Sequence, residues 1–413
     1  IPSSVIKIES SAFSDCSSLT QFNFNGSTHL DLIESCVFKG CSKLAQAIIP
    51  SYVTRIEESA FYSCTFLTEV KIPSLVTKIG PNAFNNCSSL KSIKIPSSVS
   101  EIGEYCFKLC IQLSTITLDP YLTKVQSNTF DHCYLLKELI IETQKQQIKP
   151  FKMDLIRRCN LIAIASRVDS IEPNSFAALT DLEHIKIPSS VTKIKSSAFK
   201  DCTSLTKVTF QVNSSLNEIE FNAFKGCKSL KNIEIPPSVS SIGENAFDGC
   251  SSLTKMTIPA SISTIQSYVF GGCSSLSQIV IPSSIIKIDK NAFNGCSSLK
   301  EVTIPPSVKT IGNSSFFGCK SLSTITIKKG SLERIEESAF SYCKSLKQIE
   351  IPSSVILIEQ LVFNGCSSLT NISIPSSIKK IESGTFSGCS KLAQIKIPNS
   401  IQSIESSSFL GCS

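Results

Sequence analysis

Apolar residues recur along this chain with a period of 23 residues. One copy can be written C-x-x-L-x-x-I-x-I-P-x-x-V-x-x-I-x-x-x-A-F-x-x-C, and a Phe followed three residues later by a Cys marks most copies. The 69-residue gap between Cys133 and Cys202 equals three periods, so Ile156 and Leu179 hold the Cys position of two further copies. Self-similarity at such a period is the signature of a repeat architecture, and it predicts a solenoid of about 18 repeats.

Each copy contains the signals of a short strand followed by a tight turn. Ile93 and Ile95 alternate with Lys94, which is the period-two pattern of a half-buried strand. Pro96 ends that strand because it cannot donate a ladder hydrogen bond. The rest of the copy is too short for a regular α-helix, so we expect an extended piece and one turn of 3₁₀ type.

A unit this short cannot bury its apolar residues alone, and stacked copies bury a continuous core instead. We therefore expect one solenoid domain over residues 1–413, with a parallel sheet and with contacts between neighbouring repeats only. Repeats at about 143–182 are degenerate, because Lys145 and Met153 replace the usual Val and Phe.

The L-x-x-I-x-I core resembles a leucine-rich repeat, and its combination with I-P-x-x-V and A-F-x-x-C resembles the BspA-like class of leucine-rich repeat surface proteins. The resemblance covers nearly the whole chain. It implies a curved parallel sheet, mostly β with short helical turns, in an α/β-type repeat. It also implies a protein-binding, non-enzymatic adhesion protein at the cell surface, as on mucosal parasites and host-associated bacteria, with a host-cell or matrix protein as its partner.

The repeated Phe and Cys residues are expected to fill the core. An aromatic ring in every turn can stack on its copies. The 19 cysteines are odd in number, and a buried Cys acts as a small hydrophobe with a weak S–H donor, so we expect free thiols bonded to backbone carbonyls. Many free thiols also suit a cytoplasmic protein, which keeps an intracellular leucine-rich repeat scaffold as the alternative.

Charge and motifs narrow the function further. The net charge is +7 and only five of the 40 basic residues are Arg, whereas readers of nucleic acid rely on Arg, so no nucleic-acid partner is expected. No apolar run reaches the roughly 20 residues of a membrane span. Phosphate-loop, nucleophile-elbow and zinc-protease motifs are missing from the sequence, and we predict no catalytic residue, no cofactor and no metal site. Carboxylates such as Glu336 and Glu337 are expected to be solvated, and His184 is expected to point to solvent.

A candidate partner-binding patch lies in the middle of the chain. Side chains five and seven positions after each Cys should form the outer face of the sheet, and most of them are polar. The patch combines three apolar outward residues with four nearby basic residues: Ile140, Leu161, Ala163, Lys149, Lys152, Arg157 and Arg158. Exposed apolar patches mark interaction sites. The alternative is that these repeats have decayed and that residues 143–155 cover them.

Glycosylation and self-association are two further expectations. Acceptor sequences for N-glycosylation begin at Asn25, Asn86, Asn213, Asn313 and Asn371. Residues 1 and 413 both fall inside a repeat, and exposed strand edges invite pairing. Two readings remain open: end-to-end self-association of chains, or continuation of the repeats in flanking sequence.

Overall fold

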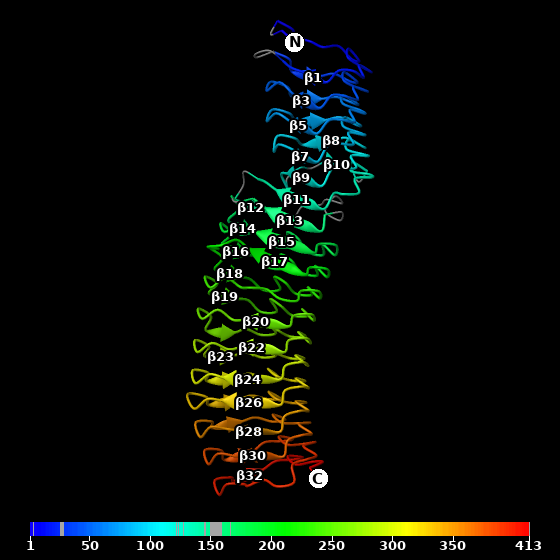
Figure 1. Cartoon of the computed structure of the whole chain (residues 1–413). Coiled ribbons are helices and arrows are strands. Elements are labelled where there is room, and N and C mark those ends of the chain that lie inside the picture. The colour runs from blue at the N-terminus through cyan, green and yellow to red at the C-terminus, as the bar shows by residue number, and fades with distance from the viewer. Residues whose placement is uncertain are drawn as a thin grey trace. The chain divides into compact units, whose positions relative to one another are not determined.

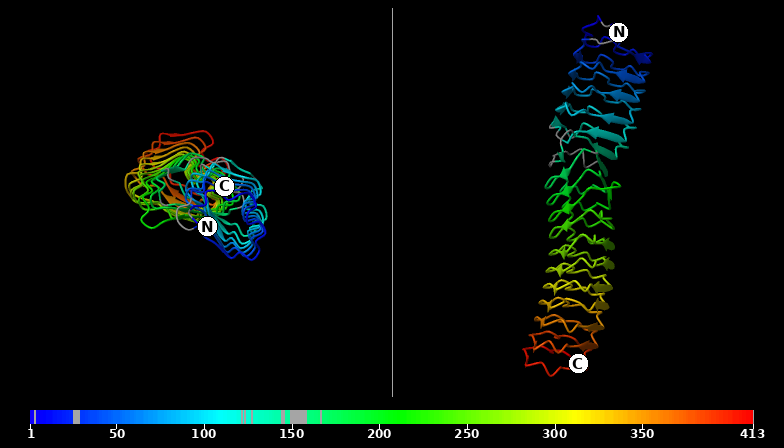
Figure 2. Two further views of the ribbon diagram at one scale, coloured as in Figure 1. Left: turned by 90° about the horizontal axis from the view of Figure 1, so that it is seen from above. Right: turned by 90° about the vertical axis from the view of Figure 1, so that its left-hand side faces the viewer.

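The chain folds into stacked coils. The computed structural model describes residues 1–2, 4–24, 29–120, 122, 124–126, 128–143, 146–148, 159–165 and 167–412. These residues form two compact units, Ile1–Val168 and Asp169–Ser413, which we call unit 1 and unit 2. Within each unit, successive coils lie one on another (Figure 1, Figure 2). The expectation of a single domain over residues 1–413 stays a prediction.

In unit 1, a coil contributes one strand to a first sheet and a shorter strand to a second. The first-sheet strands are β1 (Gln21–Phe22), β3 (Gln46–Ile48), β5 (Glu69–Lys71), β7 (Ser92–Lys94), β9 (Thr115–Leu118), β11 (Glu138–Ile141) and β13 (Leu161–Ile164). The shorter strands are β2 (Leu32–Ile33), β4 (Arg55–Ile56), β6 (Lys78–Ile79), β8 (Glu101–Ile102), β10 (Lys124–Val125) and β12 (Gln147–Ile148). Neighbouring strands pair in parallel one period apart, as Lys78 with Glu101.

Unit 2 repeats this arrangement over more coils. Its first-sheet strands are β15 (His184–Ile187), β17 (Lys207–Phe210), β20 (Lys255–Thr257), β22 (Gln278–Val280), β24 (Glu301–Ile304), β26 (Thr324–Ile327), β28 (Gln348–Glu350) and β30 (Asn371–Ser373). The shorter strands are β14 (Ser170–Ile171), β16 (Lys193–Ile194), β18 (Glu218–Ile219), β19 (Ser241–Ile242), β21 (Thr264–Ile265), β23 (Lys287–Ile288), β25 (Thr310–Ile311), β27 (Arg334–Ile335), β29 (Leu357–Ile358), β31 (Lys380–Ile381) and β32 (Ser403–Ile404). The predicted parallel solenoid is confirmed.

The core consists of ladders of identical residues, as predicted. The ring of Phe247 is fully buried and stacks on Phe224 and Phe270, with centroids 5.4 and 6.0 Å away. The Cys250 thiol donates a hydrogen bond to the carbonyl of Phe224 at 3.2 Å. The same Cys-to-Phe contact recurs from Cys41 to Cys412, and all 19 cysteines are free. The expected buried, hydrogen-bonded thiols are confirmed.

The expected 3₁₀ turns take a different form. The described residues contain no helix; the segment instead alternates between bonds within a coil and bonds between coils. Asn82 and Asn86 have φ angles of 55° and 61°, and these left-handed residues rotate the peptide planes. The Phe84 N–H then reaches the carbonyl of Cys106 in the next coil at 2.9 Å, whereas the Asn85 N–H bonds to Asn82 in its own coil at 3.0 Å. A 3₁₀ helix would bond every one of these N–H groups to a carbonyl three residues back in the same coil and leave none for the next coil.

The recurrent I-P-S-S-V sequence has a structural reason. The second Ser donates its hydroxyl hydrogen to a carbonyl of the preceding coil, as Ser98 does to Val76 at 2.7 Å and Ser284 to Ile262 at 2.7 Å. The Pro starts a tight turn that the Val N–H closes, as Val99 does to the carbonyl of Pro96 at 3.1 Å. Short hydroxyl side chains satisfy backbone groups in such turns.

We expect Phe247→Ala to destabilise the coils on both sides of it by about 3–5 kcal/mol, the usual cost of truncating a buried Phe. Exposed Phe66→Ala is the matched control and should change the free energy of unfolding by less than about 0.5 kcal/mol. Native-state hydrogen exchange of amides in residues 224–273 measures the loss. Equal protection in the two variants would contradict the stacked core.

The buried thiols predict loss of stability in alkali. Burial raises the pKa of Cys202 from 9.0 to about 12. The neutral thiol is thus favoured in the folded chain, so its contribution to stability is complete below pH 9 and is lost as the pH rises toward 12. Urea unfolding at pH 7, 9 and 10.5 should show a falling midpoint, with a shallower fall in Cys202→Ala. An identical slope in the variant would refute the assignment.

Candidate binding surface

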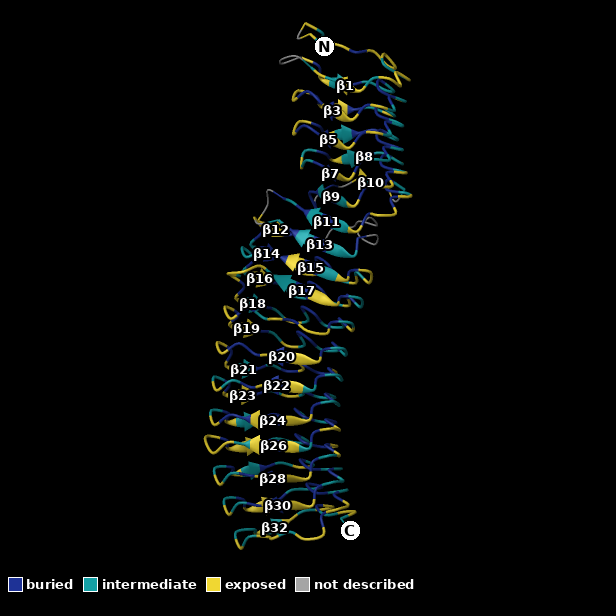
Figure 3. Ribbon diagram, in the orientation of Figure 1, coloured by how far each residue is buried: buried dark blue, intermediate teal, exposed yellow. Residues whose placement is uncertain are grey.

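The outward side chains of the first sheet form one continuous face in each unit, which we call the strand face. In unit 2 most of these side chains are exposed (Figure 3). They are Lys186, Lys207, Lys255, Thr257, Gln278, Val280, Glu301, Thr303, Thr324, Thr326, Gln348, Glu350, Asn371 and Ser373. The buried residues between them, such as Ile325 and Ile349, fix the strands to the core. Counting positions after each Cys therefore located this face correctly.

Two shallow hollows lie on the strand face of unit 2. The larger, about 390 Å³, crosses β26, β28 and β30, and Thr326, Gln348 and Asn371 are among its lining residues. The smaller, about 260 Å³, crosses β20 and β22 and reaches β24, with Lys255 and Val280 in its lining. Hydroxyl, amide and charged groups at strand spacing can hydrogen-bond to a partner along several coils at once.

The structure brings together the apolar part of the predicted central patch. Ile140 of β11 pairs with Ala163 of β13, and Leu161 lies opposite Glu138. Ile140, Leu161 and Ala163 are half-buried, so they offer less apolar surface than an exposed patch would. The four basic residues of the predicted patch lie outside the described residues: Lys149, Lys152, Arg157 and Arg158. The patch as a binding site stays a prediction.

Histidines and metal ligands do not converge in the described part of the chain. His184, expected to point to solvent, is half-buried, and its Nε2 lies 2.8 Å from the Thr209 hydroxyl. Burial and the charges of Lys207 and Lys186 lower its pKa. His132 Nδ1 lies 2.7 Å from the hydroxyl of Tyr134, two residues further along the same coil. Among the described residues, no three metal-binding side chains gather in one place, and no helix has the length and apolarity that crossing a membrane requires.

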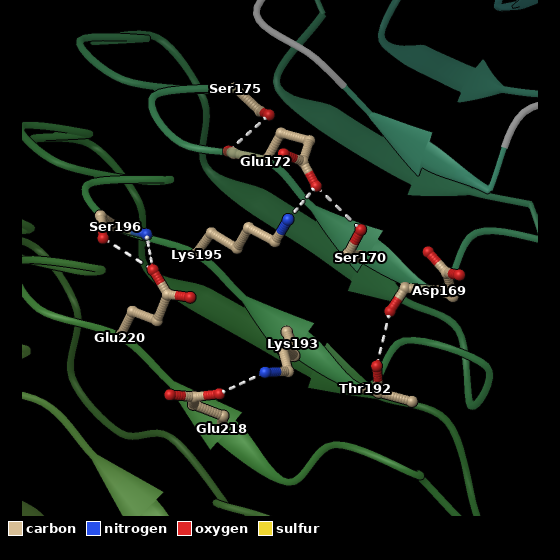
Figure 4. A network of polar contacts seen from close by, with 10 residues as sticks. All are labelled: Asp169, Ser170, Glu172, Ser175, Thr192, Lys193, Lys195, Ser196, Glu218 and Glu220. Carbon is tan, nitrogen blue, oxygen red and sulfur yellow. Dashed lines mark hydrogen bonds and ion pairs between the residues drawn. The ribbon is translucent and has the colours of Figure 1, made fainter.

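Carboxylates beside the second sheet hold neighbouring coils together. Figure 4 shows the Glu220 carboxylate accepting hydrogen bonds from the Ser196 N–H at 2.8 Å and the Ser196 hydroxyl at 2.7 Å. Glu172 pairs with Lys195 at 2.6 Å. Glu336 likewise accepts the Asn313 N–H at 3.1 Å. The expectation that Glu336 is merely solvated is therefore wrong, because its carboxylate satisfies a backbone group of the preceding coil.

The glycosylation candidates differ in accessibility. Asn213 is exposed with a φ of 58°, and Asn371 is exposed on β30. Asn86 is half-buried, and its amide nitrogen donates to the Ser63 hydroxyl at 3.2 Å. Asn313 is also half-buried, and its amide oxygen accepts the Ser314 hydroxyl at 2.8 Å. Asn25 lies outside the described residues.

Sequence reasoning missed an exposed apolar edge in unit 1. Phe66, Ile111, Tyr134 and Leu135 lie one or two positions after a ladder Cys, and Tyr134 is 71% exposed. Those positions hold Ser, Thr or Lys in every coil of unit 2 that carries a ladder Cys followed by a Leu three residues on. The departure from this pattern is the signal that would have found the edge.

A family model and solved structures place the chain among known proteins. The family model "BspA type Leucine rich repeat region (6 copies)" matches residues 1–110, 77–206, 202–323 and 309–413. The solved structure of a leucine-rich repeat protein from Bacteroides ovatus is 30% identical with a TM-score of 0.59, over 86% of this chain and 88% of that one. A leucine rich cell surface protein from Faecalibacterium prausnitzii is 27% identical with a TM-score of 0.39, over 88% of each chain. No curated protein matches the chain.

Proposed function

The chain belongs to the BspA-type leucine-rich repeat family, and from this premise we propose that it is a non-enzymatic protein-binding solenoid that adheres to host-cell or matrix proteins at the cell surface. The observation that carries the proposal is the strand face of unit 2, where exposed polar side chains stand on strand after strand in fixed register. Such a face is suited to a partner protein that contacts several strands at once.

The register of the strand face favours a protein partner over a small molecule. Thr324, Gln348 and Asn371 occupy paired positions on consecutive strands, so their side chains repeat about every 4.8 Å. The hollows on this face are shallow and lined partly by polar groups, whereas small-molecule pockets are mostly apolar and enclose their ligand. An extended partner could bond to several strands, and its affinity would come from many modest contacts.

Burial of the thiols makes free cysteines compatible with a surface location. A thiol reacts as its thiolate, and burial raises the pKa of Cys202 to about 12. Cys202 is fully buried and bonded to the carbonyl of Phe176 at 3.0 Å, so it resists oxidation outside the cell. The free cysteines are equally compatible with the second candidate, an intracellular scaffold. Labelling of intact cells with an antibody against the chain separates the two locations.

The double variant Thr326→Arg/Gln348→Arg should weaken adhesion at least about tenfold, because two long cations fill the larger hollow without disturbing the core. The control Ser353→Arg/Ser376→Arg adds the same charge at exposed residues of the proline turns and should bind within about twofold of the native chain. Surface plasmon resonance against immobilised matrix proteins and intact host cells measures both. Adhesion that is equal in the two double variants would exclude the strand face of unit 2.

Glycan mapping tests the secretory route. If the chain passes through a glycosylating secretory pathway, Asn213 should carry a glycan, because it is exposed. Asn86 should remain bare, because its amide nitrogen is bonded to Ser63. Mass spectrometry of peptides from the chain purified from its own cells gives the occupancy, with Asn213→Gln as the control. A glycan on Asn86 but not on Asn213 would contradict the accessibilities described above.

A further inference from the structure

The turns around the ladder cysteines form an edge of unit 1 whose surface differs from the same turns in unit 2. Phe66 is 62% exposed, Ile111 41%, Tyr134 71% and Leu135 44%. Ser, Thr and Lys hold the equivalent positions throughout the coils of unit 2 marked by a ladder Cys and the following Leu. The fold therefore does not need apolar side chains there, and their exposure costs solubility without contributing to the core.

Leu109 adds a further apolar side chain to the same edge. Leu109 precedes its ladder Cys, has a φ of 60° and is 37% exposed. Eight coils of unit 2 place a glycine with positive φ at this position, Gly249 and Gly272 among them. Glycine adopts this conformation without a steric penalty, whereas a bulky side chain is strained in it. Tyr342 holds the same position in unit 2 with a φ of 59°, so the turn imposes this conformation, and Leu109 differs in adding an exposed aliphatic side chain beside Ile111.

The charges around this edge have one dominant sign. From two positions before to four positions after each ladder cysteine, Cys41 to Cys133, the chain carries five lysines and one acidic residue, Asp131. The lysines are Lys39, Lys43, Lys91, Lys108 and Lys137. None of the five forms an ion pair with another described residue. Lys108 instead lies over the Tyr105 ring at 4.7 Å and Lys39 over the Tyr62 ring at 5.9 Å.

We propose that this turn edge docks an acidic segment of a partner protein that carries bulky apolar side chains. This proposal rests on the proposed function, because it takes the partner to be a protein. The turn edge is a surface separate from the strand face. Phe66 and Tyr134 lie three coils apart, or about 14 Å, which some four extended residues span. Carboxylates of the segment pair with the lysines, and its apolar side chains cover Tyr134 and Ile111.

The arrangement favours a peptide over a membrane surface. The coil between Phe66 and Ile111 presents Ser88 and Ser89 at the equivalent positions, so the apolar surface is divided into two parts. Membrane-surface binding uses a continuous apolar band with basic flanks. The turn edge instead has two separate apolar parts with lysines between and beside them. This spacing matches the side chains of an extended peptide.

The test uses the full chain and a synthetic peptide in which Glu and Asp alternate with Leu and Phe, measured by fluorescence anisotropy. The variant Phe66→Ser/Ile111→Ser/Tyr134→Ser installs the residue found in equivalent coils, so it should fold, which hydrogen exchange verifies. We expect at least tenfold weaker peptide binding by this variant. Tyr342→Ser, at an exposed aromatic residue of unit 2, should bind within twofold of the native chain. Added salt should weaken binding by the native chain.

Several results would overturn the proposal: no binding of the acidic peptide, equal binding of a peptide with Lys in place of its acids, or equal binding by the triple-Ser variant. Binding to phosphatidylserine vesicles without peptide binding would assign the edge to a membrane instead. The strand-face variant Thr326→Arg/Gln348→Arg distinguishes this proposal from the proposed function. This variant should lose adhesion to matrix proteins and keep its affinity for the peptide. Loss of peptide binding in this variant would contradict the claim that the turn edge is separate from the strand face.

Discussion

The backbone hydrogen bonds between successive coils are the interaction on which the rest of the structure depends. A 23-residue coil has too little apolar surface to enclose a core alone. The first sheet is tied by parallel pairing, as Ile93 to Ile116, and the turn side by bonds such as Phe84 N–H to the carbonyl of Cys106. Because both sides are tied to the next coil, residues at the same position of the repeat are superimposed. A Phe of the ladder therefore meets its copy, as Phe247 meets Phe270, and a ladder thiol such as Cys250 meets a Phe carbonyl of the preceding coil.

This superposition explains how far the sequence could predict the fold. A residue that recurs with the period must pack against its own copies, so the roles of Phe247 and Cys250 followed from spacing alone. The left-handed turn residues could not be found in this way. Asn82, Tyr105 and Leu361 share that conformation but no side-chain chemistry, because the bond to the next coil imposes it. The Glu220 contact with Ser196 could not be predicted from the repeat either, since it joins two different positions of the 23-residue repeat.

The candidate surface was predictable in position but not in exposure. Strand alternation placed Gln348 and Ile140 on the outer face, and both lie there. Gln348 is exposed and Ile140 half-buried, a difference that depends on side chains from other coils. Lys94, for example, crosses the face of unit 1 to pair with Glu142, 48 residues away, at 2.6 Å. No local pattern signals a contact of that range.

The same constraint leaves each surface position free to change by itself. A residue that serves stacking, such as Phe247, contacts its copies in both neighbouring coils, and its loss is felt in three coils. An outer residue such as Leu109 affects chiefly its own turn, so the strain of its left-handed conformation stays local and the neighbouring coils still hold that turn in place. A solenoid can therefore acquire a binding surface one coil at a time. Different edges of one chain can then specialise for different partners while the ladders beneath them stay the same.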